Sequence, residues 1–543
     1  GSGPGGDIYA RHAAVLAHLG RAGEALAQVE RGRGQGLARQ AAQARTNWEG
    51  VVPGVDARNL AEAAKALRQA DAWDRSAAEQ ANRLEAEGAD QESVASARQA
   101  AEAARRAREE AQQALTSIRN DVAARRPAFR ALCGLDAPTF EEFLALARAN
   151  PDTLYLTWSV APEGALLLAL HHGVGVKAYP VPLPRRELSA RVAAWREAVA
   201  PEGGGPGTDA AAELQAARAL YDALIGPAEK DGLLGVPGVK RLVVIGDGPL
   251  RELPFAALAG ADGKRLVERF PISTGVSLRL LAPPPAPPAG GEGAATPARP
   301  VGRGILCVAD PGGGAAAKAE SDLLSGFAPL PAARQEGAAV ARLFGDAATG
   351  LVGDAATKDA ILPRLEGARL LHFATHGLLD DRDGLRSGLL LAPPPAAPKD
   401  EEDGAPLELP LLTAGEILAR PLAAELTVLS ACDTGRGESG GGDGLLGLVW
   451  AFRAAGCPSI VASQWSVDDV ATGALMVRFY EGIRAGKRKD DALRDAMLSV
   501  AGAPGGATAA PYFWAAFQLN GDAGPLGAGA SGGDADEPAP SGR

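Results

Sequence analysis

Two residues of this sequence pair a nucleophile with a proton acceptor. Cys432 follows the strand-like run LTVLSA, and His376 follows the strand-like run ARLLHFAT. A thiol with a pKa of about 8.5 is largely protonated at neutral pH, so a nucleophilic cysteine needs a neighbour that takes its proton. A histidine at the end of an adjacent strand supplies that function. The pair predicts acyl transfer, with Cys432 as nucleophile and His376 as general base.

The residue after the histidine completes the expected reaction centre. Gly377 lets the backbone turn and come close to a substrate carbonyl. The N–H groups of Gly377 and Cys432 are therefore the expected donors to the oxyanion that forms when the thiolate attacks. His376 is expected to protonate the leaving amine, after which water releases the acyl-enzyme.

Three further residues are expected to contact a substrate. Asp433 and Asp468 are predicted to line a pocket for a basic side chain, with a loop anchor at Asp433 and a helix N-cap at Asp468 as the alternatives. Trp465 lies in the predicted strand SIVASQW. Its side chain is predicted to form a pocket wall or, equally, part of the core.

Other reactive side chains have simpler explanations. His372 shares a strand face with His376 and is expected to be a core histidine. Ser439 lies in a Gly-x-Ser-x-Gly match, but inside a glycine-rich loop rather than between a strand and a helix, so a serine hydrolase is the weaker interpretation. The remaining cysteines, Cys133, Cys307 and Cys457, are expected to be core residues.

No cofactor and no metal are expected. The cysteines lack Cys-x-x-Cys spacing, and no phosphate-binding Gly-x-x-x-x-Gly-Lys-Ser/Thr motif occurs. The glycines at Gly246 and Gly248 follow a strand but lack the third glycine of a dinucleotide site. His171 and His172 have no acidic or cysteine partner at ligand spacing, so a surface position is expected for both.

The elements that must position the pair indicate an α/β fold. Apolar strands are predicted at GILCVAD, ARLLHFATHG, LTVLSACDTG, SIVASQW and YFWAAFQL, and amphipathic helices alternate with them. This alternation predicts a mostly parallel sheet flanked by helices on both faces. Reactive groups in such a sheet collect at the carboxyl ends of the strands, where His376 and Cys432 both fall.

The front of the chain is predicted to be helical. Residues 9–40 are rich in alanine with a break around Gly20, which indicates a helix, a turn and a second helix, as in the last unit of a tetratricopeptide array. Residues 56–124 indicate a long antiparallel helical hairpin with an interruption near Gly88. An earlier α/β region then starts with the strand hairpin DTLYLTWSV and ALLLALHHG. Its next helix carries Leu188, Val192, Trp195 and Val199 on one face.

These patterns predict six segments. They are tetratricopeptide-like helices over 1–45, a helical hairpin over 46–130, a first α/β lobe over 131–282, a Pro/Gly-rich linker over 283–303, a catalytic α/β lobe over 304–521 and a disordered tail over 522–543. The first lobe has no His-Gly and Cys pair of the kind found in the second, and is therefore expected to be inactive.

Composition excludes several classes of protein. A hydrophobic content of 46% with 22% charged residues is typical of a soluble globular protein of several domains. The formal charge of −11 argues against nucleic acid as a partner, because phosphate neutralisation needs a basic face. The sequence has no run of 18 apolar residues that would span a membrane, and its few separated cysteines fit a reducing cytoplasm.

The motifs resemble those of a known family. HFATHG, LSACDTG, the glycine-rich GESGGGDGLLGLVWAF, AGCPSIVASQWSVDD and FWAAFQLNG are similar, in order and spacing, to the CHAT family of caspase-like, separase-related cysteine proteases. VVIGDGPLRELPFAAL and LPAARQEGAAVARLFG also resemble that family, so the resemblance covers about Thr153 to Gly521. In the caspase-type signature the histidine lies roughly 50 residues before the cysteine.

The resemblance implies a His–Cys dyad that acts on protein substrates, often switched on by a sensor module, and it makes the first lobe an inactive caspase-like lobe. It also implies that the segment SQWS, which contains Trp465, pairs with an extended substrate, as the corresponding strand does in caspase-like folds. We therefore predict a cytoplasmic cysteine endopeptidase regulated by its helical N-terminal region or by a regulatory protein bound there. The alternative is a catalytically inactive caspase-like scaffold that acts in protein–protein interaction.

Overall fold

The computed structural model describes the chain in two compact units. Unit 1 comprises Gly1–Gly32, Pro138–Ala414 and Pro421–Arg543, and unit 2 comprises Arg33–Ala137 with Gly415–Arg420. Within these limits the described residues are 4–43, 55–86, 90–125, 139–201, 205–281, 302–311, 327, 329–380, 386–394, 409–418, 420–430, 443–465 and 467–527.

Eleven strands in the described part of unit 1 form one continuous sheet, in the order β3-β2-β1-β4-β5-β14-β13-β12-β8-β6-β7. Their bounds are β1 (Thr153–Ala161), β2 (Gly164–His171), β3 (Gly175–Val181), β4 (Arg241–Ile245), β5 (Ile272–Thr274), β6 (Arg303–Ala309), β7 (Ala348–Val352), β8 (Ala368–Ala374), β12 (Leu426–Leu429), β13 (Ser459–Ser463) and β14 (Phe517–Gly521). The two α/β regions expected from the sequence thus contribute strands to the same sheet.

Most neighbouring strands in this sheet run parallel. β7, β6, β8, β12 and β13 are parallel to one another, as are β1, β4, β5 and β14. The antiparallel pairs are β1 with β2, β2 with β3, and β13 with β14. A mostly parallel sheet is stable only when both faces are covered, which explains why its central strands, such as β4, β8, β12 and β13, are buried along their whole length, whereas the edge strands β3 and β7 are partly exposed.

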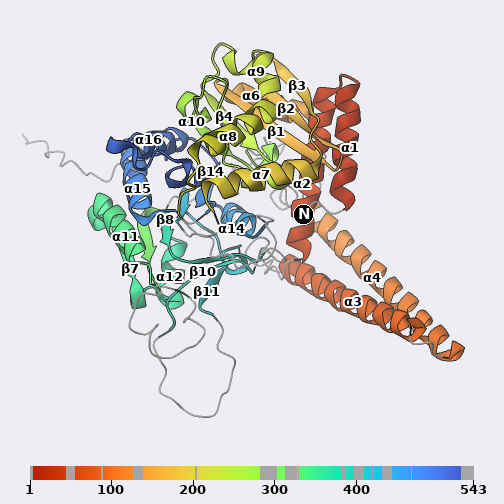
Figure 1. Cartoon of the computed structure of the whole chain (residues 1–543). Coiled ribbons are helices and arrows are strands. Elements are labelled where there is room, and N and C mark those ends of the chain that lie inside the picture. Colours follow the sequence, from red (N-terminus) through yellow and green to blue (C-terminus); the bar gives the residue numbers. More distant parts are fainter. Residues whose placement is uncertain are drawn as a thin grey trace, which may run out of the picture. The chain divides into compact units, whose positions relative to one another are not determined.

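Helices cover both faces of the sheet (Figure 1). Those of unit 1 are α1 (Pro4–His18), the first part of α2 (Ala22–Gln43), α6 (Phe140–Ala149), α7 (Arg185–Val199), α8 (Ala210–Leu224), α9 (Gly226–Lys230), α10 (Leu266–Arg269), α11 (Pro331–Phe344), α12 (Lys358–Leu365), α14 (Asp443–Ala454), α15 (Asp469–Arg484) and α16 (Lys489–Ala501). One core cluster contains side chains of α7, α8, α11, α15 and α16, and a second contains those of α1, α2 and α6. The predicted α/β fold class, a mostly parallel sheet flanked by helices and preceded by a helical region, is confirmed.

The amphipathic spacing of α7 shows how local pattern becomes packing. Leu188, Val192, Trp195 and Val199 recur every three or four residues and are all buried. They belong to the same core cluster as Leu154, Leu156 and Trp158, which alternate along β1. The helix predicted from this spacing is confirmed, and it covers one face of the sheet.

Beyond β8 the chain forms a small second sheet. It has the order β11-β10-β9, from β9 (Gly377–Leu378), β10 (Gly388–Leu390) and β11 (Leu411–Thr413), and both pairings are antiparallel. β11 leads into α13 (Ala414–Leu418). Because β9 begins at Gly377, this sheet starts directly after His376.

The helix-turn-helix predicted near the N-terminus is confirmed as α1 and α2. Gly20 forms the turn with a φ of 74°, a left-handed conformation that glycine adopts without strain. Ala13, Leu16, Ala25, Leu26 and Val29 pack in one cluster with residues of β1, β2 and β4. The pair therefore shares a hydrophobic core with the α/β sheet.

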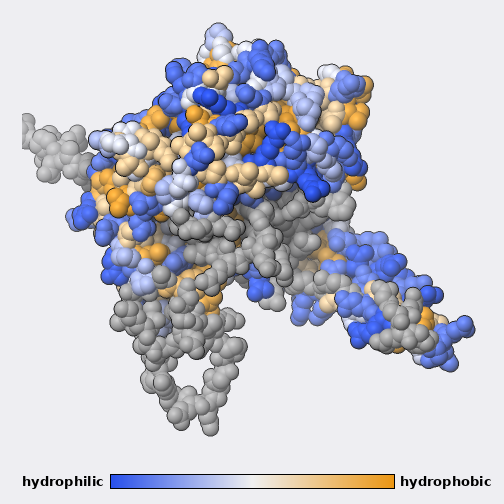
Figure 2. All heavy atoms as spheres, viewed as in Figure 1, coloured by the Kyte–Doolittle hydropathy of each residue, from blue (hydrophilic) through white to orange (hydrophobic). Residues whose placement is uncertain are grey.

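Unit 2 contains the predicted helical hairpin, formed by α3 (Val55–Ala86) and α4 (Gln91–Arg125) (Figure 1). Its interior is built mainly from alanine, together with Leu60, Leu115 and Val122. The face visible in Figure 2 is mostly hydrophilic. The buried alanine, leucine and valine side chains form a narrow apolar stripe on each helix, along which the two long helices pack.

Two expectations near the C-terminus were wrong. The strand expected over Tyr512–Leu519 begins only at Phe517, because Pro511 starts a 3₁₀ turn that ends at Phe513. Residues 522–527 do not belong to a disordered tail: Lys489 Nζ bonds to Asp522 and Gly524, and Arg369 bonds to the Gly527 carbonyl. Residues 528–543 lie outside the described part of the chain.

Candidate active site

β8 and β12 are adjacent parallel strands whose carboxyl ends lie together. Phe373 of β8 is paired with Leu429 of β12. His376 lies three residues beyond Phe373, and in the sequence Cys432 lies three residues beyond Leu429. Cys432 itself is outside the described residues, as are Asp433 and Ser439.

The His376 side chain is only 8% exposed. The ring of Phe327 lies with its centroid 5.4 Å from that of the imidazole. On the backbone, the His376 carbonyl accepts a hydrogen bond from the Leu390 amide at 2.9 Å, and Gly377 pairs with Leu389 of β10. The predicted base is therefore held by the small second sheet on its backbone and by an aromatic ring on its side chain.

Asp310 directly follows β6, next to the carboxyl end of β8. Its amide donates to the carbonyl of Ala374 at 3.0 Å, and its φ is 48°, in the left-handed region. One carboxylate oxygen accepts from the Leu330 amide at 2.8 Å and the other from the guanidinium of Arg334 at 3.0 and 3.1 Å. Most residues with a Cβ are strained in this conformation, and aspartate and asparagine are the ones that tolerate it best.

A polar cluster lies in the core between α11 and the ends of β8 and β12. Glu336 of α11 is 5% exposed, and its Oε2 accepts a hydrogen bond from Ser430 Oγ at 3.2 Å. Its Oε1 lies 3.2 Å from Nε2 of His372, without the geometry of a hydrogen bond. Nδ1 of His372 lies 3.2 Å from the Tyr480 hydroxyl. The prediction that His372 is a core histidine is confirmed, because its side chain is completely buried.

Two of the cysteines expected in the core are described, and both are there. Burial, with the nearby Glu336 carboxylate, raises the pKa of Cys307 to about 12. Cys457 is fully buried and donates a hydrogen bond to the Ser459 carbonyl at 3.2 Å. A buried thiol with a raised pKa is a poor nucleophile, so Cys307 has the properties of a structural residue. Cys133 lies outside the described residues.

The residues expected to contact a substrate make intramolecular contacts. The indole N–H of Trp465 donates to the Tyr512 carbonyl at 3.1 Å, and its ring packs edge-on against Trp195 in the core. Asp468 is the N-cap of α15 and accepts from the amides of Val470 and Ala471. The core and N-cap alternatives are therefore both observed, and the substrate-binding roles stay predictions.

A second carboxylate follows Asp468 in the chain. The next residue, Asp469, has a raised pKa, because of partial desolvation first and then the carboxylates of Asp468 and Glu336. In the SQWS segment, the Gln464 amide donates to the Ala516 carbonyl at 2.9 Å. Any substrate strand would therefore have to pair with this segment along its other edge.

The expectation for His171 was wrong. Its side chain is buried at the end of β2, where Nε2 lies 3.1 Å from the Pro151 carbonyl and Nδ1 accepts from the Gly173 amide. Desolvation lowers its pKa, and the neighbouring His172 adds to the effect. Among the residues described, no group of three or more His, Cys, Asp or Glu side chains is placed to hold a metal ion.

Sequence reasoning did not single out Glu336 or Asp310. The signal for Glu336 was a carboxylate on the apolar face of the helix LPAARQEGAAVARLFG, next to Gly337 and near Val340, both of which are buried. The signal for Asp310 was a charged residue directly after the apolar strand GILCVA. Polar groups in such places are costly unless they have specific partners.

Comparison with known proteins agrees with this architecture. The sequence profile of the CHAT domain matches residues 214–522, which is more than half of the chain. The chain belongs to the CHAT domain family, a caspase-like domain related to proteases, and the resemblance drawn from its motifs is confirmed.

Two curated relatives match part of the chain. The chain is 29% identical over 342 residues to tetratricopeptide repeat protein 28 of Mus musculus and 28% identical over 347 residues to that of Homo sapiens. Each match covers 56% of this chain and 13% of the relative, so the chain spans only a small part of the relatives it matches.

Solved structures include more distant neighbours. Two crystal structures of the Saccharomyces cerevisiae separase–securin complex align with TM-scores of 0.41 and 0.40 at 10% and 9% identity. Each alignment covers 70% of this chain, with 30% and 31% of the separase structures. None of the helices described is both long and apolar enough to cross a bilayer.

Proposed function

We propose that this chain is a caspase-like cysteine endopeptidase in which His376 and Cys432 form the dyad. The observation that carries the proposal is the register of β8 and β12: the two residues follow a paired position, Phe373 with Leu429, by the same number of residues on adjacent parallel strands. Neighbouring strands lie about 4.8 Å apart, so equal offsets favour contact between the two side chains.

The proposed reaction proceeds by acyl transfer. His376 takes the thiol proton, and the Cys432 thiolate attacks the scissile carbonyl to form a tetrahedral oxyanion held by the amides of Gly377 and Cys432. Collapse breaks the C–N bond as His376 gives its proton to the leaving amine, which leaves a thioester. Water, deprotonated by His376, hydrolyses the thioester and restores the thiol. In this proposal Asp433, Asp468 and Trp465 contact the substrate.

The catalytic lobe spans 304–521 in this proposal, and an inactive lobe over 131–282 supports it. Regulation would enter through the helical front of the chain, where a regulatory protein binds. In support, Glu30 of α2 is buried and accepts a 2.5 Å hydrogen bond from Ser277, directly after β5 and its turn. A change in α2 would therefore reach the sheet directly. Since the nucleophile must stay reduced, we expect the enzyme to act in the cytoplasm.

The test is cleavage of a peptide library by the wild type, Cys432→Ala and His376→Ala. Each variant is expected to lose at least about 10³-fold in kcat/KM, because dyad residues act as one unit. Cys457→Ala, which removes a buried thiol elsewhere in the same unit, is the control and should keep the rate of the wild type. Activity that survives in Cys432→Ala would support the serine hydrolase using Ser439. No cleavage by the wild type with its partners present would favour the inactive scaffold.

A further inference from the structure

A single carboxylate connects the two strands that end at the proposed dyad. Glu336 reaches from α11 to His372, which lies in β8 four residues before His376. With its other oxygen it accepts from Ser430, which follows β12 and lies two residues before Cys432. One side chain thus contacts both strands close to the points where they open into the site.

This cluster is an expensive arrangement for a protein core. Glu336 is 5% exposed and His372 is fully buried, and bringing a carboxylate into such surroundings is unfavourable unless its partners compensate for the lost water. The compensation is incomplete, because Glu336 Oε1 and His372 Nε2 face each other at 3.2 Å without hydrogen-bond geometry. An apolar pair of the same size would pack here at lower cost, so stability alone does not explain the cluster.

Titratable groups face Glu336 from each element packed around it. Cys307 comes from β6, His372 from β8, and Tyr480 and Asp469 from α15. The carboxylate raises the pKa of Cys307, Tyr480 and Asp469, in each case after the larger effect of burial. The side-chain contacts of Glu336 itself are Nε2 of His372 at 3.2 Å and the hydroxyl of Ser430 at 3.2 Å, and Ser430 lies two residues before the proposed nucleophile in the sequence.

We infer that Glu336 is a positioning residue for the dyad, which acts through Ser430 on the segment that carries Cys432 and through His372 on the strand that carries His376. This inference rests on the proposed function. Its physical basis is that displacement of a reactive group by about 1 Å costs on the order of 10²-fold in rate. A bridge between the two strand ends limits such displacement.

The experiment measures alkylation of Cys432 by iodoacetamide against pH, with the modified residue identified by mass spectrometry. The variants are Glu336→Ala, Ser430→Ala and the combination of both. Glu213→Ala is the matched control: Glu213 of α8 is an equally buried carboxylate of unit 1, bound to Trp195 and Arg265 rather than to residues at the strand ends. Urea unfolding of every variant reports stability separately.

We expect Glu336→Ala to lower the alkylation rate at pH 7 at least about tenfold and to move the midpoint of the pH profile towards that of an ordinary thiol, about 8.5. Ser430→Ala should change the alkylation rate and the midpoint in the same directions. The double variant should be alkylated no more slowly than Glu336→Ala, since the two substitutions remove the same bridge. Glu213→Ala should keep the alkylation profile of the wild type at a comparable loss of stability.

Ser430→Ala removes only a hydroxyl group, so it carries the test even if Glu336→Ala does not fold. A wild-type alkylation rate in Ser430→Ala would overturn the inference while leaving the dyad intact. Equal slowing in Glu213→Ala and Glu336→Ala would overturn it as well. If Cys432 of the wild type reacts no faster than the same thiol in the urea-unfolded chain, the dyad and the positioning role both fail.

Discussion

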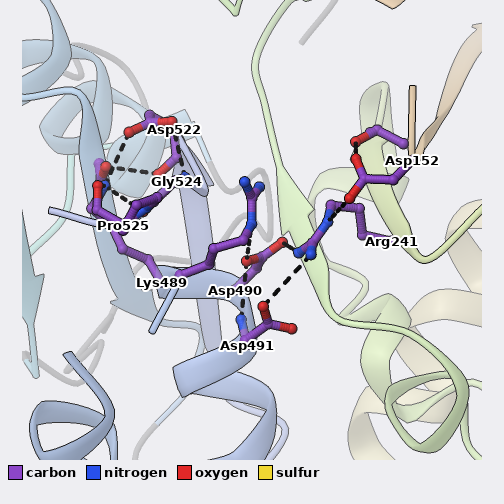
Figure 3. A network of polar contacts seen from close by, with 11 residues as sticks. Asp152, Arg241, Lys489, Asp490, Asp491, Asp522, Gly524 and Pro525 are labelled. Atoms are coloured by element: carbon purple, nitrogen blue, oxygen red, sulfur yellow. Dashed lines mark hydrogen bonds and ion pairs between the residues drawn. The ribbon is translucent and has the colours of Figure 1, made fainter. Parts of the chain in front are cut away.

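Arg241 and Asp490 form an ion pair that is almost completely buried, with Nη1 of the guanidinium 2.5 Å from Oδ2 of the carboxylate (Figure 3). The side chains are 11% and 2% exposed. Arg241 is the first residue of β4 and Asp490 lies in the first turn of α16, so the pair attaches that helix to the sheet. Asp152 and Asp491 contact the same guanidinium.

Removing the guanidinium should destabilise unit 1 strongly. Arg241→Met keeps the aliphatic stem but removes the shorter ion pair of the buried Asp490, which keeps only the contact of Arg488 Nε with its Oδ1 at 3.3 Å. We expect this to cost about 3 kcal/mol in the free energy of unfolding, the lower end of the range for a broken buried pair. The matched control is Arg191→Met, which breaks the exposed pair of Arg191 and Glu187 and should cost no more than about 1 kcal/mol. Urea unfolding followed by tryptophan fluorescence measures both. Equal losses in the two variants would contradict the role given to burial.

The same network predicts a loss of stability in acid. Desolvation alone would raise the pKa of Asp152, but its hydrogen bond and charge interaction with Arg241 hold that pKa below its ordinary value. As the pH falls, Asp152 is therefore protonated in the unfolded chain before it is protonated in the folded protein. Its contribution to the free energy of unfolding is complete above about pH 4 and is lost as the pH falls through the lower pKa of the folded state. Asp152→Asn should be less stable than the wild type at pH 7, and the difference in urea midpoint should shrink towards pH 3. A difference that does not change with pH would contradict this.

The backbone of Asp310 predicts an unusual order of variants. In the left-handed region a Cβ costs about 1–2 kcal/mol, which glycine avoids. Asp310→Gly should therefore be about 1 kcal/mol more stable than Asp310→Ala, although both lose the bonds to Leu330 and Arg334. Asp310→Asn should be the mildest, because asparagine tolerates this conformation and keeps an acceptor for Leu330. Urea midpoints of the three variants test the order, and an alanine variant at least as stable as the glycine variant would refute it.

A contact of one glycine determines how closely α11 approaches β6. A Cβ at Gly337 would lie 2.8 Å from Cβ of Ala309, so Gly337→Ala should destabilise by about 1–3 kcal/mol despite the better helix propensity of alanine. The control is Gly473→Ala in α15, where a Cβ meets nothing within 4 Å and the change should stabilise by about 0.5–1 kcal/mol. If close packing determines the effect, thermal unfolding should show a lower midpoint temperature for Gly337→Ala and a higher one for Gly473→Ala than for the wild type. A stabilised Gly337→Ala variant would mean that α11 moves away freely.

Much of the fold follows from local pattern. The spacing of Leu188, Val192, Trp195 and Val199 predicts α7, and the run LTVL predicts β12, because periodicity and apolar runs depend only on neighbours in the chain. The helical hairpin of unit 2 was equally evident from its composition. The short strands β5 and β7 were not predicted, because their three and five residues acquire strand structure only by pairing with neighbours distant in sequence.

Burial of polar groups was harder to predict. His171 was predicted to be a surface residue because nothing near it in sequence offers a partner. Its Nε2 nevertheless lies 3.1 Å from the carbonyl of Pro151, which is 20 residues earlier in the chain and is brought beside it by the antiparallel pairing of β1 and β2. The same holds for Glu336, whose partners come from β8 and the end of β12. A side chain is buried or exposed according to the packing of whole elements, which no local window contains.

By itself, the sequence determined which residue types end the strands: a histidine before a glycine at 376 and 377, and a cysteine at 432. It also determined that apolar strands alternate with amphipathic helices along the chain, a pattern for which a mostly parallel sheet covered by helices is the stable arrangement. Only the tertiary structure decided that β8 and β12 are neighbours in the register of Phe373 with Leu429, and that Glu336 reaches both. The physical reason is that strand order and helix docking minimise the free energy of the whole core, in which residues far apart in the sequence contribute together.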